Sequence, residues 1–154
     1  MPDLVQDPTG NDLTYRIIGA AMAVHNALGS GYKEEVYEKA LEAELRQREM
    51  EVQRQFAVNV YHTDAHVALF YLDLLVEGCV VVEVAFSHQL TDDELAQVIN
   101  YLKAAIAPVG LFFNFGRRRL EYRRVFPGKE QDHPVQRTGR DDVRKSNRPD
   151  QSVK

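Results

Sequence analysis

Two acidic residues, Asp73 and Glu83, lie within apolar, β-branched segments of the chain. Residues 66–76 and 79–86 have the composition of two strands, and the turn between them contains Glu77 and Gly78. A carboxylate in apolar surroundings costs of the order of several kcal/mol unless a cation or hydrogen-bond donors meet it. Two carboxylates on one such hairpin therefore suggest a shared metal ion.

The turn decides whether the two side chains meet. A two-residue turn would pair Asp73 with Val82 and direct Glu83 to the opposite face of the sheet. A three-residue loop of residues 76–78 would pair Asp73 with Val81 instead. Asp73 and Glu83 would then be diagonal neighbours on one face, with β-carbons about 7 Å apart. We expect this second register.

The chemistry that such a pair supports is the binding of a hard cation. Mg²⁺ prefers oxygen ligands, which Asp73, Glu83 and the backbone carbonyl of Val84 could supply. In phosphodiester hydrolysis, an ion of this kind polarises the phosphoryl group and lowers the pKa of the attacking water. The alternative is that one acid is exposed and the other pairs with an arginine. The spacing alone does not decide between them.

Periodicity predicts the elements that position these residues. Helical spacing begins near Asn11 or Asp12 and ends at Gly29 to Gly31, with Ile18, Ala21, Met22, His25 and Leu28 on one face. A second helix is expected over residues 33–49, with an apolar stripe of Val36, Ala40, Leu41 and Leu45.

The spacing then changes to that of strands. Residues 52–62 alternate between apolar and polar types, and the hairpin follows. Helical spacing returns after Thr91 or Asp92 and ends before Pro108, and two strands follow within residues 109–115 and 119–126. A strand, a helix and a strand in this order predict a right-handed parallel unit. We expect an α/β domain over residues 11–126, in the order ααβββαββ, with a mixed central sheet flanked by helices.

Composition sets the broad class. The 154 residues are 44% hydrophobic and 27% charged, as in an ordinary globular protein of one domain. No apolar run approaches the roughly 20 residues of a membrane span. Residues 1–10 have the character of a flexible leader and not of a signal peptide, and residues 127–154 that of a disordered polar tail. We expect a cytoplasmic protein without an organic cofactor.

The distribution of charge bears on nucleic acid as a partner. A formal net charge of −4 argues against binding through bulk electrostatics. Arginines nevertheless cluster in the segment GRRRLEYRR, in which Arg117, Arg119 and Arg123 are expected to share a face that could contact phosphates. A solvated edge strand explains the same residues equally well.

Two polar–aromatic pairs stand at helical spacing. Glu34 and Tyr37 are neighbours near the start of the second helix, and Gln97 and Tyr101 are neighbours on the third. Each pair places a polar group beside an aromatic ring.

Taken together, these motifs resemble the GxxExxY family of the PD-(D/E)XK nuclease superfamily. Gly31, Glu34 and Tyr37 match the naming motif, and the segments YLDLLVEGCVVVEVA and QVINYLKA resemble the acidic hairpin and the Gln-x-x-x-Tyr helix. The closing strands match as well. The resemblance extends over roughly residues 12–126 and implies a restriction-endonuclease-like core.

The resemblance also implies roles. Asp73 and Glu83 would bind Mg²⁺ or Mn²⁺, and Glu34 would approach as an added ligand or a holder of metal-bound water. Gln97 would orient a water molecule or a phosphate, while Tyr101 packs behind it. Tyr37 would be a packing and hydrogen-bonding residue. Nucleic acid would be the partner.

One position departs from the pattern. The superfamily places a lysine two residues after the second acid, and this chain has Ala85. Such a group is typically worth about 10²–10³ in rate, and Lys33, Lys39 and Lys103 are poorly placed to replace it. We therefore expect a nuclease-like, metal-binding protein with weak or lost hydrolysis. The alternatives are a catalytically inactive binding or interaction module, and a nuclease whose cation comes from elsewhere.

Overall fold

A computed structural model describes residues 11–87 and 90–128 of the chain. The expected leader and almost all of the expected polar tail lie outside the described residues. Within them the elements are α2 (Asn11–Leu28), α3 (Glu34–Gln47), β1 (Val52–His62), β2 (Ala65–Val76), β3 (Val80–Ala85), α4 (Asp92–Ala105), β4 (Val109–Asn114) and β5 (Glu121–Val125). This is the order ααβββαββ that the sequence predicts.

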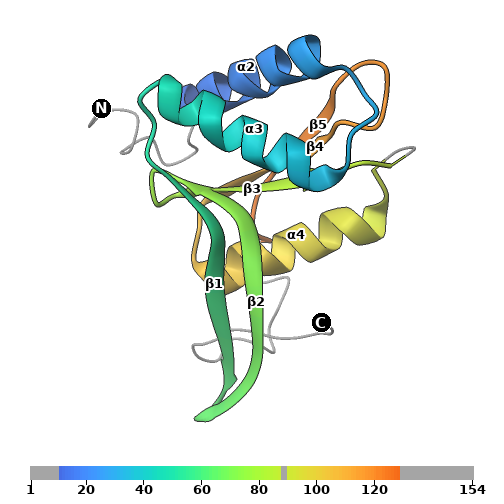
Figure 1. The fold of residues 1–154 in the computed structure, drawn as a ribbon. Helices are drawn as coiled ribbons and strands as arrows, with labels where there is room; N and C mark the ends of the chain where they lie inside the picture. The colour runs from blue at the N-terminus through green and yellow to red at the C-terminus, as the bar shows by residue number, and fades with distance from the viewer. Residues whose placement is uncertain (1–10, 88–89, 129–154) are drawn as a thin grey trace.

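The five strands form one mixed sheet in the order β1-β2-β3-β4-β5. β3 and β4 are parallel and the other neighbours are antiparallel. The helix α4 connects the parallel pair, as expected for a crossover unit. Figure 1 shows α2 and α3 on one side of the sheet and α4 on the other.

Alternation along β3 sends side chains to two separate cores. Val80, Val82 and Val84 pack in the core beneath α2 and α3, whereas Val81 and Ala85 pack in the core beneath α4. By the same alternation Glu83 leaves the sheet on the side of α4. Glu83 is thereby placed between the apolar residues Val81 and Ala85 on this face of the sheet.

The helices begin and end close to the predicted residues. Thr91 caps α4 in a capping box with Glu94, and the left-handed residue Ile106 ends this helix. The predicted apolar faces were wrong at two positions, because Met22 is 44% exposed and Val36 is 39% exposed. Leu13, Ile17 and Tyr37, which the predicted stripes leave out, are fully buried in the core beneath these helices.

The turn between β2 and β3 also differs from the prediction. Glu77 and Gly78 both have positive φ, and the N–H of Cys79 donates to the carbonyl of Val76. Cys79 is then the extra residue of the loop, so that Val76 pairs with Val80. The backbone N–H and the carboxylate of Glu77 both bond to Glu51, which fixes the turn from a segment outside the hairpin.

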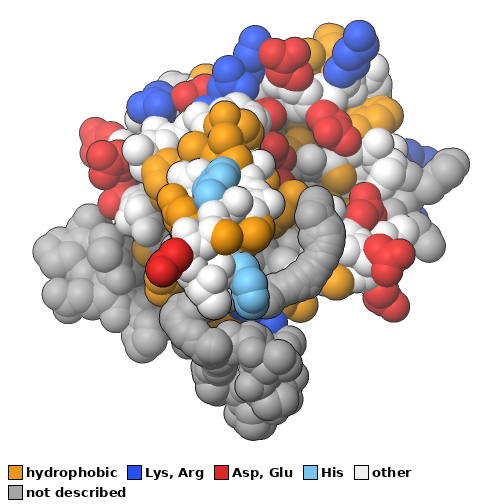
Figure 2. Space-filling view, turned by 90° about the horizontal axis from the view of Figure 1, so that it is seen from below, with side chains coloured by type: hydrophobic (Ala, Val, Ile, Leu, Met, Phe, Trp, Pro, Cys, Tyr) orange, Lys and Arg blue, Asp and Glu red, His pale blue; other side chains and the backbone are white. Residues whose placement is uncertain are grey.

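β1 and β2 extend past the rest of the sheet as a long curved arm (Figure 1). Hydrophobic and histidine side chains gather over its outer end, as Figure 2 shows. Tyr61, Val67, Leu69 and Tyr71 are all about half exposed there. His62 and His66 flank the turn of this arm and are exposed, and His66 bonds to Asn59.

Candidate active site

Asp73 and Glu83 face each other where β2 and β3 stop pairing. The ladder between these strands runs from Val76–Val80 to Leu74–Val82, and the two acids come next on either strand. The backbone N–H of Asp73 donates to Glu83 Oε2 at 3.0 Å, and that of Val84 donates to Asp73 Oδ2 at 2.8 Å. The acids are therefore directly opposite, and the predicted diagonal register was wrong by two residues because the loop includes Cys79.

Burial makes this pair costly to ionise. It raises the pKa of Asp73 to about 6, an effect that the charge of Glu38 increases and the hydrogen bond from Val84 opposes. Burial, followed by the charge of Asp73, holds the pKa of Glu83 well above its usual value. Neither carboxylate takes part in an ion pair with another described residue. Within residues 11–87 and 90–128, therefore, no arginine pairs with either acid, contrary to the alternative that the sequence left open.

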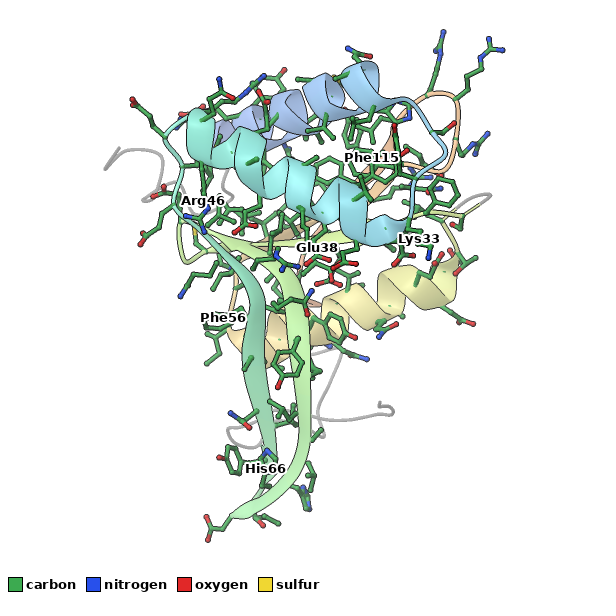
Figure 3. All side chains as sticks on the ribbon, viewed as in Figure 1. Lys33, Glu38, Arg46, Phe56, His66 and Phe115 are labelled. Atoms are coloured by element: carbon green, nitrogen blue, oxygen red, sulfur yellow. The ribbon has the colours of Figure 1, made fainter. Side chains whose placement is uncertain are left out.

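A third carboxylate comes from α3, and it is that of Glu38. This residue is only 7% exposed and points from α3 toward the strands (Figure 3). Arg54 Nη1 donates to Glu38 Oε2 at 3.1 Å, and Gln55 Nε2 donates to the same oxygen at 2.6 Å. Glu38 is not among the site residues predicted from the sequence, although it lies one turn after Glu34 and beside the buried Tyr37.

Gln55 connects this helix to the acid pair. Its Nε2 also lies 3.4 Å from Asp73 Oδ1, so one amide group stands between two carboxylates. Its backbone has a φ of 56° within β1. No local signal in the sequence marks this residue, since an alternating strand predicts ordinary extended backbone at every position.

Glu34, the predicted third acid, is placed less directly. Its charge contributes to the raised pKa of Asp73, after that of Glu38. Among the described residues, no three or more His, Cys, Asp and Glu side chains are arranged to hold a metal ion. What the structure assembles is the pair Asp73 and Glu83, with Glu38 linked to it through Gln55.

The helix α4 contributes Gln97 and Tyr101. The side-chain amide of Gln97 donates to the hydroxyl of Tyr101, whose ring stacks on Phe70 with centroids 4.3 Å apart. Burial raises the pKa of Tyr101, and the charges of Glu83 and Asp73 add to this effect. The Tyr101 hydroxyl thus experiences the field of the acid pair, and Gln97 contacts that hydroxyl.

Tyr37 has the surroundings of a structural residue. It is fully buried, and its ring stacks on Phe115 with centroids 4.7 Å apart. Its hydroxyl donates to the carbonyl of Gly29 and accepts from the N–H of Tyr32. These contacts fix the connection between α2 and α3, which places the first turn of α3 beside the site.

With this geometry established, comparison with known proteins identifies the family. The profile of the PD-(D/E)XK nuclease superfamily matches residues 11–125. This chain belongs to the PD-(D/E)XK nuclease superfamily. Its mixed sheet with helices on both faces is the fold expected of that superfamily.

Solved structures agree on the fold. The crystal structure of SSO0001 is similar with a TM-score of 0.50 and 12% sequence identity, over 64% of this chain. The chain matches only 52% of the length of SSO0001.

No curated protein matches the sequence. PD-(D/E)XK nucleases typically use divalent metal ions. None of the helices among the described residues has the length and hydrophobicity needed to cross a membrane.

In this PD-(D/E)XK domain, Ala85 lies on the same side of β3 as Glu83. It is 6% exposed and packs in the core with Leu90 and Val98. The neighbouring residue on β4 is the buried Asn114, whose side chain bonds to both the N–H and the carbonyl of Ser87. The chain after Ala85 is thereby fixed to the end of β4.

The predicted basic residues surround the turn between β4 and β5. An open hollow of about 430 Å³ is lined by Arg117, Arg118, Arg119, Leu120 and Glu121. Arg117 and Arg123 both approach the carboxylate of Glu121 at 3.8 Å. The carbonyl of Arg117 bonds to the buried His25, so this turn is held against α2.

Proposed function

We propose that this PD-(D/E)XK protein binds a divalent metal ion, Mg²⁺ or Mn²⁺, between Asp73 and Glu83 and engages nucleic acid, with phosphodiester hydrolysis weak or lost. The observation that carries the proposal is the pair itself. Two largely buried carboxylates face each other, and the donors that meet them among the described residues are uncharged: the backbone N–H groups of Asp73 and Val84 and the side-chain amide of Gln55. Such a donor set fits a hard cation, which prefers oxygen ligands and relieves the repulsion of paired acids.

The remaining ligands follow from the geometry around this pair. The N–H of Val84 points toward β2, and the carbonyl of a strand residue faces the same neighbouring strand as its N–H. The Val84 carbonyl is therefore directed to the side on which Asp73 lies. Glu34 would act from α3 as a holder of water, and Gln97 would act from α4 through Tyr101. We assign Gly31, Glu34 and Tyr37 to the GxxExxY motif.

The expected weakness of hydrolysis rests on Ala85. In this superfamily a bound divalent ion supplies Lewis-acid polarisation of the phosphoryl group. The residue two positions after the second acid would position the attacking water and stabilise developing negative charge. The methyl group of Ala85 can do neither, and it is packed against apolar side chains of the core. Lys39 does not substitute for it, since its ammonium pairs with Glu35 at 3.0 Å.

The contact with nucleic acid would use the arginine turn. Arg117 and Arg119 line the open hollow, and Arg117 is about half exposed. Their guanidinium groups could bind phosphates in bidentate fashion. Glu121 partly offsets the charge of Arg117 and Arg123, so we expect a weak and salt-dependent contact.

Isothermal titration of the full chain with Mn²⁺ and Mg²⁺ tests the metal claim. We expect binding to the wild type and its loss in Asp73→Ala. Glu44→Gln is the matched control, because Glu44 is on α3 but pairs with Arg48 away from the site. No binding to the wild type, or equal binding to Asp73→Ala, would defeat the claim.

A second function is favoured by the packing of Ala85. Its burial suggests a nuclease fold kept as a binding or interaction module, because the position of the missing lysine is filled by core contacts. A nuclease assay on single- and double-stranded DNA and RNA, with Mn²⁺ and without it, separates the functions. Cleavage that appears in Ala85→Lys and disappears when Asp73→Ala is added supports the metal-dependent nuclease. If Ala85→Lys creates no Mn²⁺-dependent cleavage on any of these substrates, the binding module is supported instead.

A further inference from the structure

Gln55 has a backbone conformation that its place in the fold does not explain. The other described non-glycine residues with positive φ are Glu49, Thr63, Glu77 and Ile106, and all lie at helix ends or in turns. Gln55 lies inside β1, between Arg54, which pairs with Leu74, and Phe56, which pairs with Leu72. A left-handed conformation is disfavoured for residues with a side chain. Such strain in a regular element often accompanies a functional role.

The side chain shows what this conformation achieves. Gln55 Nε2 is 2.6 Å from Glu38 Oε2 and 3.4 Å from Asp73 Oδ1, so it links α3 to β2. The other Asp73 oxygen accepts from Val84. Both oxygens of Asp73 therefore face neutral N–H donors, one from each neighbouring strand.

Neutral donors and charged donors have different consequences for a carboxylate. An amide orients the carboxylate and leaves its charge in place, whereas a guanidinium would neutralise it and compete with a cation. The guanidinium next in sequence, that of Arg54, pairs with Glu38 and Glu42 instead. A chain of hydrogen bonds therefore connects Arg54 to Glu38, Glu38 to Gln55, and Gln55 to Asp73. Among the described residues, no arginine pairs with Asp73 itself. Partners of this kind orient metal ligands in many proteins.

We propose that Gln55 is a positioning residue for divalent-ion binding at Asp73, and that its left-handed backbone is retained because it brings the amide between Glu38 and Asp73. This inference rests on the proposed metal function. Because Gln55 contacts Asp73, its role would be exerted through the orientation of that carboxylate.

Glycine at position 55 separates stability from ion binding. Gln55→Gly suits a positive φ and removes the amide. We expect the metal-free variant to be as stable as the wild type in urea denaturation, yet to bind Mn²⁺ at least about tenfold more weakly in calorimetry. Gln55→Asn also tolerates the left-handed region but is one methylene shorter. We expect it to bind Mn²⁺ with an affinity between those of the wild type and Gln55→Gly.

Gln53→Gly is the matched control. Gln53 is an exposed glutamine of the same strand, in regular register with Leu75. Glycine there should lower stability and leave the Mn²⁺ affinity unchanged, the reverse of the pattern at position 55. Wild-type affinity in Gln55→Gly, with binding still lost in Asp73→Ala, overturns this inference alone. A wild type that binds no Mn²⁺ overturns the proposed function and this inference with it.

Discussion

Asp73 and Glu83 each accept a hydrogen bond from the backbone of the other's strand, at 2.8 Å from Val84 and 3.0 Å from Asp73 itself. The carboxylates thus replace the carbonyl groups that would otherwise continue the ladder between β2 and β3. The strands can separate here without leaving these N–H groups unsatisfied. The acid pair therefore lies at the position where the hydrogen-bonded ladder between β2 and β3 ends.

This relationship predicts how stability depends on pH. The pKa of Asp73 is about 6 in the folded chain and ordinarily 3.8, so the folded state holds the proton more tightly. The stability that this proton contributes is present below about pH 4 and is lost as the pH rises through about 6. Asp73→Asn should therefore be about 3 kcal/mol more stable than the wild type near pH 7 and similar near pH 4.

Urea denaturation at several pH values measures this difference, and Asp64→Asn is the control because Asp64 is exposed in the turn of the arm. A difference between Asp73→Asn and the wild type that does not change with pH would show that Asp73 does not titrate as described.

A second prediction concerns Ala85 and Glu83. Lysine at position 85 must enter a packed core and should lower the free energy of unfolding by about 1–3 kcal/mol. Its ammonium would share the face of Glu83, so the loss should be larger in a Glu83→Gln background. A double-mutant cycle measures the coupling, which we expect to be about 1 kcal/mol or more. Additive effects would mean that the two side chains do not meet.

Tyr37 provides a third prediction. Tyr37→Phe leaves the carbonyl of Gly29 without its donor and should cost about 1–2 kcal/mol, while Tyr37→Ala should cost about 3–5 kcal/mol. Tyr15→Phe is the control, since Tyr15 is 76% exposed and should change stability by less than about 0.5 kcal/mol. Equal stability of Tyr37→Phe and the wild type in denaturant titration would contradict the structural role of this hydroxyl.

Two glycines should respond to alanine in opposite directions. A β-carbon at Gly116 would lie 2.6 Å from the nitrogen and 2.7 Å from the oxygen of Ser87, whose backbone Asn114 holds in place. Gly116→Ala should therefore lower stability by about 1–3 kcal/mol. Gly19 lies inside α2, where an added β-carbon meets only the end of Arg48 at 3.5 Å.

Gly19→Ala should accordingly raise stability by about 0.5–1 kcal/mol, because alanine loses less entropy in a helix. Thermal unfolding of both variants tests the pair, and a shift of the same sign in both would argue against the close approach of Gly116 to Ser87.

The sequence by itself determined the elements and their order. Helical and alternating spacing, the cap at Thr91 and the turn at Gly78 are local signals, and each acts within a few residues. They predicted the mixed sheet, the parallel unit around α4, and Asp73 and Glu83 as the acids of interest. The superfamily match covers residues 11–125, the same range as the predicted domain to within a residue.

Only the tertiary structure decided how these acids are held. Glu51 fixes the turn that makes Cys79 the extra residue and sets Asp73 opposite Glu83. Glu38 is buried because Arg54 and Gln55 meet it from a strand that is distant in sequence. Local periodicity carries no information about such contacts, since they arise when separate elements pack and their polar groups must find partners.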